Sequence, residues 1–503
     1  MLSRESISLG DALLRAAAAG PERDAVVLPG ERWSYGHLAE RAQGIARSLA
    51  ALGVAPGDRV AVLMPNSAEC LAALFGTALA GATVVPINAR FKAPEMRHIL
   101  ADSGAKVVLT SDLMDAHSNL SDQLRAATTE VPIVLLGAKV EEGLIGEAEF
   151  DALGVELERP QVALRDTAML LYTSGTTAQP RGCRISHEAL TGVWGGVADA
   201  MDITAQDAVW NPCPMFHIAA IGVSVSCVVV GAANVTTRHF DPGESVELLA
   251  AERPSVWYPA YDRIMLGIVN HPRFGEIDLS NLKSVLAVGQ PDTLRRLQAA
   301  VPDAVLVSTF GMTESAGCAV IARVDDPEPV RMETAGGPVE GLEARLAEDG
   351  EILLRGPLLF DGYHNEAASP FVDGWFHTGD LGARVHDRIT FRGRKKEMLR
   401  VGGENVAPAQ IEATLMAHPA VQMAAVIGRP DERLDEVPYA FVELRADATE
   451  AELIEHCRAS LASFKVPRRV RFVEQWPMSA TKIQKFRLRE LLVDAEATET
   501  VAS

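Results

Sequence analysis

Cysteine is scarce in this sequence, and no two of its six cysteines form a CxxC pair. They are spread along the chain as Cys70, Cys183, Cys213, Cys227, Cys318 and Cys457. Disulfide-stapled folds and structural zinc sites depend on closely spaced cysteines, so this spacing speaks against both. The expected location is therefore a reducing cytoplasm.

Positive charge is also in short supply. The chain carries 47 Lys and Arg residues against 67 Asp and Glu residues, which gives a net charge of −20. A protein of this charge is not expected to bind nucleic acid or an anionic membrane surface in a general way. If its substrates are anions, basic residues must gather locally around them.

Long hydrophobic runs are nearly absent. The N-terminus carries Arg4 and Glu5 among its apolar residues and lacks the continuous apolar core of a signal peptide. The most apolar stretch, 218–235, is interrupted by Gly222 and Gly231 and has no basic flank. We therefore expect no integral membrane segment there, but a buried helix followed by a strand.

The 503 residues are 48% hydrophobic, which is enough for a core in more than one domain. The first half alternates apolar strand-like runs with helix-like runs. Strands are expected at 58–64, 82–87 and 105–110, with helices at 67–80 and 93–101. This βαβ alternation predicts a mainly parallel sheet covered by helices, and it returns at 168–172 and 284–310.

After residue 336 the segments become short and are separated by Gly and Asp turns. Strands are expected at 343–346, 351–355, 375–376 and 388–392, forming a small antiparallel or barrel-like unit at about 324–394. Alternation resumes after the charged run 393–397. The predicted fold is α/β, with a large N-terminal domain (1–394) of mainly parallel sheets plus this unit, and a small mobile α+β domain (395–503).

The most informative stretch is the loop 173–182, Thr-Ser-Gly-Thr-Thr-Ala-Gln-Pro-Arg-Gly, directly after an apolar strand. Hydroxyl groups, backbone N–H groups around Gly175 and the charge of Arg181 suit a polyphosphate. The loop is not a Walker A motif, and it lacks a dinucleotide-binding GxGxxG. A polar surface turn is the alternative if the loop is considered alone.

Several further motifs follow in a fixed order over nearly the whole chain. They are Pro214–His217, Phe310–Glu314, Gly374–Asp380, Gly393–Arg394, Gly402–Asn405 and Lys482. Together with the loop, they resemble the adenylate-forming superfamily, which includes acyl-CoA synthetases, peptide-synthetase adenylation domains and luciferases. The chain is most similar to the acid–CoA ligase branch.

The resemblance implies an enzyme that uses ATP, Mg²⁺ and coenzyme A with a small-molecule carboxylic acid. Because the carboxylate and the α-phosphate are both anions, catalysis would consist mostly of neutralisation and in-line positioning. Two alternatives stay open: a ligase that hands the acyl group to a carrier protein or partner enzyme, and a degenerate member that does not adenylate. A homodimer is compatible with the sequence, but the sequence does not determine the oligomeric state.

Most of the implied nucleotide contacts lie in the motifs already named. They are Thr173, Ser174, Gly175, Thr176, Thr177, Arg181, Phe310, Gly311, Met312, Thr313, Asp380 and Arg394. In the family, Thr313 contacts a phosphate oxygen and is counted as catalytic, Asp380 binds the ribose hydroxyls, and Glu314 holds Mg²⁺. Outside this context Glu314 would be a solvated acid, and Phe310, which matches an aromatic packed on adenine, would be a core residue.

Lys482 matches the catalytic lysine of the family, and His217 matches a gate between the acyl pocket and the thiol entrance. Gly402 and Gly403 match glycines that leave room for pantetheine, although a tight turn also explains them. Lys396 lies at the family's hinge position. The implied acyl pocket is lined by His217, Gly222, Trp257, Tyr258, Val288, Gly289 and Met312.

The chain departs from the family pattern at three positions near the phosphates. Ala178 replaces a usual Gly, Arg181 a usual Lys, and Thr481 a usual Gly. Arginine keeps the positive charge but spreads it over a planar fork. These departures put the efficiency of ATP binding and of the two half-reactions in question.

Overall fold

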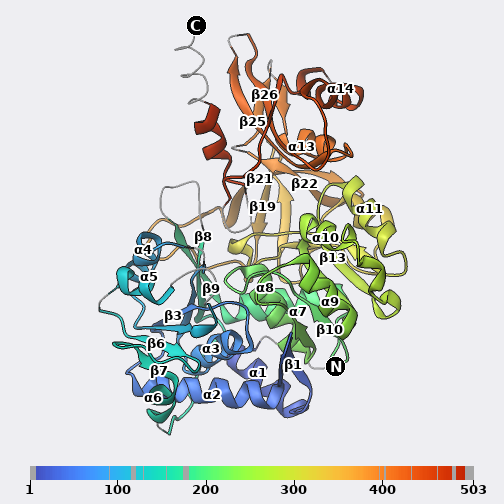
Figure 1. Cartoon of the computed structure of the whole chain (residues 1–503). Helices are drawn as coiled ribbons and strands as arrows, with labels where there is room; N and C mark the ends of the chain where they lie inside the picture. The colour runs from blue at the N-terminus through green and yellow to red at the C-terminus, as the bar shows by residue number, and fades with distance from the viewer. Residues whose placement is uncertain are drawn as a thin grey trace. The chain divides into compact units, whose positions relative to one another are not determined.

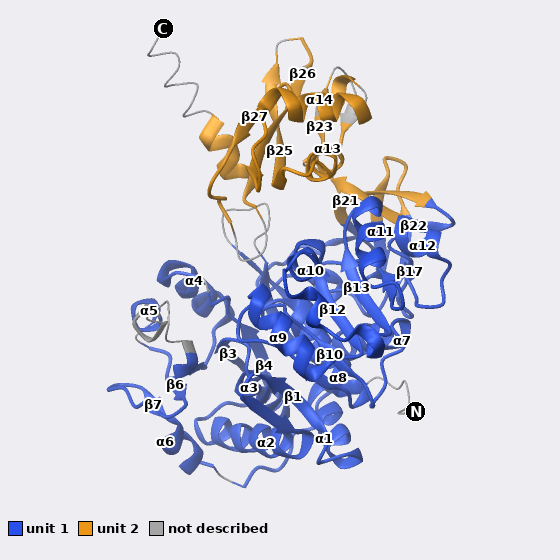
Figure 2. Ribbon diagram, turned by 45° about the vertical axis from the view of Figure 1, so that its right-hand side comes forward, with its two compact units in different colours: residues 1–345, 353–377, 385–389 blue, residues 346–352, 378–384, 390–503 orange. Residues whose placement is uncertain are grey.

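The computed structural model describes residues 7–89, 91–114, 120–128, 130–154, 156–173, 180–395, 397–401, 404–431, 433–461, 463–478 and 483–492. The chain divides into two compact units (Figure 2). Unit 1 comprises residues 1–345, 353–377 and 385–389, and unit 2 comprises 346–352, 378–384 and 390–503. The predicted α/β class, with a large N-terminal and a small C-terminal domain, is confirmed. The exact boundary after residue 394 stays a prediction.

The first sheet of unit 1 is built from the predicted βαβ alternation. It has seven strands in the order β7-β6-β5-β3-β4-β8-β9. Their bounds are β3 (Arg59–Leu63), β4 (Thr83–Pro86), β5 (Val107–Ser111), β6 (Ile133–Leu136), β7 (Ile145–Gly146), β8 (Thr167–Thr173) and β9 (Arg181–Ser186). Only β9 is antiparallel to its neighbour. The helices α3 (Ala68–Leu79) and α4 (Ala93–Ser103) connect strands as expected.

The second sheet of unit 1 also has seven strands, in the order β14-β13-β12-β10-β11-β1-β2. Their bounds are β1 (Asp24–Leu28), β2 (Glu31–Ser34), β10 (Ala208–Trp210), β11 (Ala233–Val235), β12 (Val256–Tyr261), β13 (Ser284–Val288) and β14 (Val305–Val307). All neighbours except β1 and β2 are parallel. The connecting helices are α9 (Pro242–Glu252), α10 (Asp262–Val269) and α11 (Pro291–Ala300).

Two helices pack side by side and link the two sheets (Figure 1). Helix α7 (His187–Ala200) contacts β8 and β9 of the first sheet, and α8 (Ile218–Val230) contacts β11 of the second. Most of α8 is buried, and β11 follows it, so the buried helix and strand predicted for 218–235 are confirmed. No helix among the described residues is long and apolar enough to cross a membrane.

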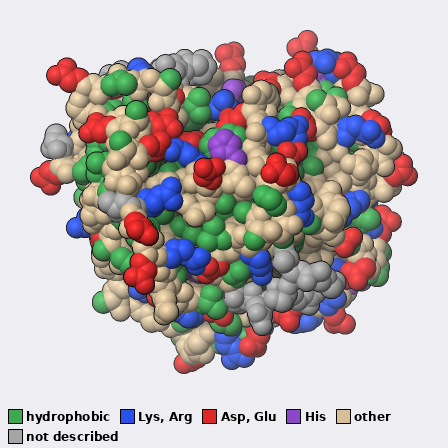
Figure 3. Space-filling view, turned by 90° about the horizontal axis from the view of Figure 1, so that it is seen from below, with side chains coloured by type: hydrophobic (Ala, Val, Ile, Leu, Met, Phe, Trp, Pro, Cys, Tyr) green, Lys and Arg blue, Asp and Glu red, His purple; other side chains and the backbone are tan. Residues whose placement is uncertain are grey.

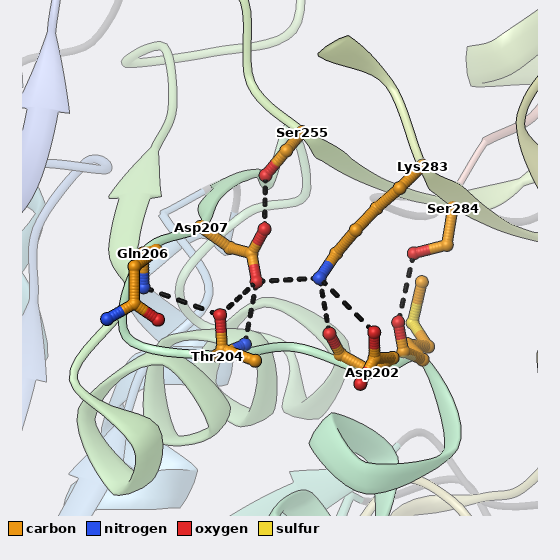
Figure 4. Close-up of polar contacts among 8 residues, drawn as sticks. Asp202, Thr204, Gln206, Asp207, Ser255, Lys283 and Ser284 are labelled. Carbon is orange, nitrogen blue, oxygen red and sulfur yellow. Dashed lines mark hydrogen bonds and ion pairs between the residues drawn. The ribbon is translucent and has the colours of Figure 1, made fainter.

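A polar cluster ties the loop after α7 to the second sheet (Figure 4). The carboxylate of Asp207 accepts hydrogen bonds from Thr204, from the Ser255 hydroxyl at 2.7 Å and from the Lys283 ammonium at 2.8 Å. Ser255 and Lys283 directly precede β12 and β13. The cluster therefore lies at the amino ends of these parallel strands, and its role is structural.

Helix α7 also holds the start of the chain's first helix, α1 (Leu9–Ala19). The backbone N–H of Leu9 donates to Nδ1 of His187 at 3.2 Å. His187 is 2% exposed, and burial lowers the pKa of its ring to about 4. The His187 ring is therefore neutral near pH 7, and its Nδ1 accepts the hydrogen bond from Leu9.

Beyond β14 the strands predicted at 343–346 and 351–355 are confirmed, but the strand predicted at 375–376 is the start of an 11-residue strand. A five-stranded sheet has the order β18-β19-β21-β20, with β22 beside β21. Its strands are β18 (Glu343–Leu346), β19 (Glu351–Arg355), β20 (Phe371–Val372), β21 (Trp375–Val385) and β22 (Arg388–Arg394). A further five-stranded sheet of unit 2 contains β23 (Leu399–Val401), β24 (Glu404–Val406), β25 (Val421–Asp431), β26 (Asp435–Leu444) and β27 (Arg469–Phe472). Helices α13 (Pro408–Met416) and α14 (Glu450–Ser460) pack with it.

The acidic net charge does not gather into one large field on the face seen in Figure 3. Acidic and basic side chains are interspersed there, with apolar side chains between them. The six cysteines are free thiols, and all of them are buried. Burial raises the pKa of Cys213 and of Cys318 to about 12, so these thiols stay protonated and act as small apolar side chains.

Candidate active site

The carboxyl ends of the parallel strands of the second sheet carry three of the predicted acyl-pocket residues: His217, Val288 and Gly289. Strands β12 and β13 are paired so that Tyr261 lies opposite Val288. Gly289 follows at the end of β13, and His217 is the residue before α8, in the connection that leaves β10. Ligands of parallel α/β sheets bind outside these strand ends. Val288 is 40% exposed there.

The phosphate-loop prediction falls between two paired strand ends. Thr173 ends β8, Arg181 begins β9, and the two residues are directly opposite in the antiparallel pairing. Ser174, Gly175, Thr176, Thr177 and Ala178 lie outside the described residues. The structure thus places the ends of the loop together, at the carboxyl end of β8.

In the turn that carries Glu314, the backbone of Gly311 packs closely against the backbone of Gly317. Strand β15 (Thr309–Phe310) is followed by Gly311, where an added Cβ would lie 2.2 Å from the carbonyl oxygen of Gly317. Only glycine fits at that position. The short helix η4 (Thr313–Ser315) follows, and the Ser315 hydroxyl bonds with both backbone groups of Met312. Phe310 is buried, while Met312, Thr313 and Glu314 are half-buried.

Tyr363 joins Glu314 to Arg181. Its hydroxyl donates to Oε1 of Glu314 at 2.8 Å, and the Arg181 guanidinium lies over its ring, 3.8 Å from the centroid. Arg181 also forms an ion pair with Glu366 at 3.6 Å. Burial, and then the charge of Glu314, raises the pKa of Tyr363, so its hydroxyl is a proton donor. The cation replacing the usual lysine is therefore stacked and paired within unit 1.

Backbone hydrogen bonds fix Tyr363 in this place. The segment 360–364 runs along β9: Arg184 exchanges bonds with Gly362 and Asp361, and the N–H of His364 donates to Gly182. At its start, the N–H of Phe360 donates to the carbonyl of Glu314 at 2.9 Å. Sequence reasoning missed Tyr363. Nothing in its local sequence shows that it lies under Arg181.

The predicted acyl-pocket residues do not all face the same side of the second sheet. Neighbouring residues of a strand point to opposite faces, so Trp257 and Tyr258 face apart. The ring of Trp257 packs edge-on against Trp210 with centroids 5.6 Å apart, and Tyr258 lies 5.8 Å from Trp194. Tyr258 is thus on the side where α7 and α8 lie, and Gly222 of α8 contacts the same Trp194.

In unit 2, the predicted ribose-binding acid lies beside the predicted basic contact. Asp380 is 4% exposed, and its Oδ1 is 3.5 Å from Nε of Arg394. The backbone before it is fixed because Gly379 donates to Glu351 at 2.9 Å and Asp380 itself donates to the Thr378 hydroxyl at 3.1 Å. A buried carboxylate held rigidly in this way suits a pair of hydroxyl donors.

The remaining predicted residues of unit 2, Lys482, Gly402, Gly403 and Lys396, lie outside the described residues, as does Thr481. The neighbouring lysine is described. Nζ of Lys485 is 2.7 Å from Glu412 and 3.7 Å from Glu397, and this side chain is 18% exposed. Lys485 therefore stabilises unit 2 through ion pairs, and the catalytic assignment to Lys482 stays a prediction.

Comparison with known proteins decides the family. The AMP-binding enzyme family model matches residues 13–364, and the model of the AMP-binding enzyme C-terminal domain matches residues 410–482. The chain belongs to the AMP-binding enzyme family. The first match contains Arg181, Glu314 and Tyr363, and the second ends at Lys482.

Relatives of named activity align with nearly the whole chain. A feruloyl-CoA synthase of Amycolatopsis sp. is 34% identical and covers 96% of this chain and 98% of its own. The long-chain-fatty-acid–CoA ligase FadD13 of Mycobacterium tuberculosis is 31% identical with coverages of 96% and 98%. The crystal structure of the anthranilate CoA ligase AuaEII with anthranoyl-AMP matches with a TM-score of 0.89 at 27% identity, covering 98% of both chains.

These findings confirm the adenylate-forming acyl-CoA synthetase branch predicted from the motifs. The enzyme activates a carboxylic acid with ATP and transfers the acyl group to coenzyme A, and ATP, Mg²⁺ and coenzyme A are the cofactors of this family. The relatives named above act on different acids, so the comparison does not identify the acid that this enzyme uses.

Proposed function

We propose that the constellation of Arg181, Tyr363 and Glu314 is the phosphate and metal side of the adenylation site. The observation that carries the proposal is the hydrogen bond from Tyr363 to Glu314 beneath the guanidinium of Arg181. It brings a cation and a positioned carboxylate to the end of β8, where the phosphate loop begins. Both groups have the chemistry that Mg²⁺ and the phosphates require.

Glu314 is a suitable ligand for this ion because its carboxylate is a hard oxygen donor that Tyr363 holds in one orientation. The bound ion would neutralise phosphate charge and leave the remaining coordination positions to phosphate oxygens and water. Within the described part of the chain, no three His, Cys, Asp or Glu side chains gather in a metal-binding group. A single carboxylate with phosphate ligands is therefore the arrangement we propose.

In the first half-reaction, an oxygen of the acid attacks the α-phosphorus of ATP, the bond to the β-phosphate breaks, and pyrophosphate leaves. Arg181 and the loop 173–177 would hold the departing phosphates, Thr313 would contact a phosphate oxygen, and Asp380 with Arg394 would hold the ribose. Phe310, Gly311 and Met312 would lie along the adenine. Lys482 would neutralise the charge that the acid and the α-phosphate bring together.

In the second half-reaction, the thiol of coenzyme A attacks the acyl carbon and AMP leaves. His217 would lie at the entrance between acid and thiol, and Gly402 and Gly403 would leave room for pantetheine. Because Lys482 and the thiol arm need the same space, the C-terminal domain (395–503) would change position between the half-reactions, with Lys396 as the hinge. The acid would lie among Gly222, Tyr258, Val288, Gly289 and Met312, with Trp257 behind them.

Pyrophosphate release across a panel of acids, with and without coenzyme A, tests this function. We expect acid-dependent pyrophosphate release, and acyl-CoA as the final product. Release of pyrophosphate without acyl-CoA formation would favour transfer to a carrier protein or partner enzyme instead. If no acid gives pyrophosphate, the chain is a degenerate member, and the proposed roles are wrong.

We also propose a cytoplasmic location, supported by the free, buried thiols of all six cysteines. No general binding of nucleic acid is proposed, because acidic residues outnumber basic ones by 67 to 47. A homodimer stays a prediction, which sedimentation of the purified protein at several concentrations would test.

A further inference from the structure

Trp194 fills a slot that two glycines open. This tryptophan of α7 is 0% exposed. A Cβ added to Gly222 of α8 would lie 1.6 Å from its ring, and one added to Gly317 would lie 2.8 Å from it. The indole therefore rests directly on bare backbone on two sides: α8, and the turn that follows Glu314.

Three further contacts determine the orientation of this ring. Its Nε1–H donates to the carbonyl of Ala316 at 2.7 Å, and the Ser226 hydroxyl donates to the backbone carbonyl of Trp194 at 2.5 Å. The ring of Tyr258 packs against it, tilted by 56°, at a centroid distance of 5.8 Å. Ala316 has a left-handed backbone with φ of 52°, so the indole bonds the most constrained residue of the turn.

These neighbours are the residues among which the proposed function puts the acid. Gly222 and Tyr258 belong to the proposed acyl pocket, and Ala316 and Gly317 follow the turn of Met312 and Glu314 directly. An acyl group entering past His217 and Met312 would meet the indole of Trp194 between α8 and this turn. The ring is fully buried, so it fills the space between α8 and this turn, and an acyl group could extend there only if the ring were smaller.

We infer that Trp194 closes the far end of the acyl pocket, so that the enzyme activates compact acids and rejects long unbranched ones. The inference rests on the proposed function of this site and adds a substrate class to it. A hydrophobic pocket that lacks room for one methylene group discriminates against it by about 10- to 200-fold. Rejection should therefore become steep once the acyl group reaches the ring.

The alternative is that Trp194 is only a core residue between α7 and α8. Both explanations predict a loss of stability when the ring is removed, so stability does not separate them. Only closure of the pocket predicts a change in which acids are used. Trp210 is a matched control because it is equally buried, at 0% exposure, but packs with Trp257 on the other face of the sheet.

The experiment measures kcat/KM for pyrophosphate release with straight-chain acids from acetate to palmitate. We compare the wild type with Trp194→Ala, Trp194→Phe and Trp210→Phe. The wild type should favour short acids, and Trp194→Ala should move the optimum to longer acids and gain about tenfold or more on them. Trp194→Phe, which removes less volume, should move it less, and Trp210→Phe should leave the order of preference unchanged.

A wild type that uses palmitate as well as it uses short acids would overturn the inference, and so would a folded Trp194→Ala enzyme with an unshifted profile. If Trp194→Ala does not fold, the profiles of the wild type and of Trp194→Phe decide by the same criteria. Failure of the proposed function looks different, because no acid would then release pyrophosphate in any variant.

Discussion

Replacing Tyr363 by phenylalanine isolates the contribution of one hydroxyl group to the proposed metal site. The hydroxyl donates to Oε1 of Glu314 at 2.8 Å, and the aromatic ring carries Arg181 at 3.8 Å. Phenylalanine keeps the ring beneath the guanidinium and removes only the donor. The variant therefore changes how the carboxylate is held and leaves the neighbouring charges in place.

The size of the effect follows from the charge of the acceptor. A hydrogen bond to a charged group contributes about 1.5–3 kcal/mol, and loss of a residue that orients a metal ligand typically lowers metal affinity or activity by about 10- to 100-fold. The two ranges agree, since 1.4 kcal/mol corresponds to about tenfold. We expect Tyr363→Phe to need about 10- to 100-fold more Mg²⁺ for half-maximal pyrophosphate release.

The assay follows pyrophosphate release against free Mg²⁺ at constant ATP. Tyr35→Phe is the matched control, because the Tyr35 hydroxyl is also buried but donates to the backbone carbonyls of Cys227 and Ala232, at 3.0 and 2.6 Å. It should lower stability without moving the Mg²⁺ dependence. If Tyr363→Phe lowers stability alone and its Mg²⁺ curve matches the wild type, Tyr363 does not position a metal ligand.

Three other predictions concern unit 2 and the pH dependence of unit 1. Lys482→Ala should slow pyrophosphate release by about a hundred- to a thousand-fold but spare thioester formation from supplied acyl-adenylate. The control variant Lys485→Ala should mainly lower the thermal stability of unit 2. Near-normal pyrophosphate release by Lys482→Ala would refute the catalytic assignment of Lys482. Gly403→Leu should leave adenylation intact and block transfer to coenzyme A, so that acyl-adenylate accumulates; equal losses in both half-reactions would mean a structural turn. Burial lowers the pKa of His187 to about 4, below its ordinary value of about 6.5. Its neutral ring therefore contributes fully to the free energy of unfolding above pH ~6.5. About 3 kcal/mol of this stability is lost as the pH falls from 6.5 toward 4. Urea unfolding against pH should show a shallower loss in His187→Gln, which cannot take up this proton, and identical slopes would contradict the account.

Local sequence determined the strands, helices and family of this protein well. Alternation of apolar runs predicted β3, α3, β4, α4 and β5, because strand and helix periodicities are properties of neighbouring residues. The apolar stretch 218–235 was correctly predicted as buried helix and strand, because glycines and serines and the lack of a basic flank are visible in the chain itself. The ordered motifs pointed to the family that the comparisons then established.

Tertiary structure alone decided which side chains meet. Tyr363 is 182 residues from Arg181 and 49 from Glu314 in sequence, yet pairing of the segment 360–364 with β9 puts it between them. Trp194 reads as an ordinary helix residue until Gly222 and Gly317 are seen to open a slot for its ring. Such contacts depend on strand pairing and helix packing between distant segments, which local periodicity does not encode.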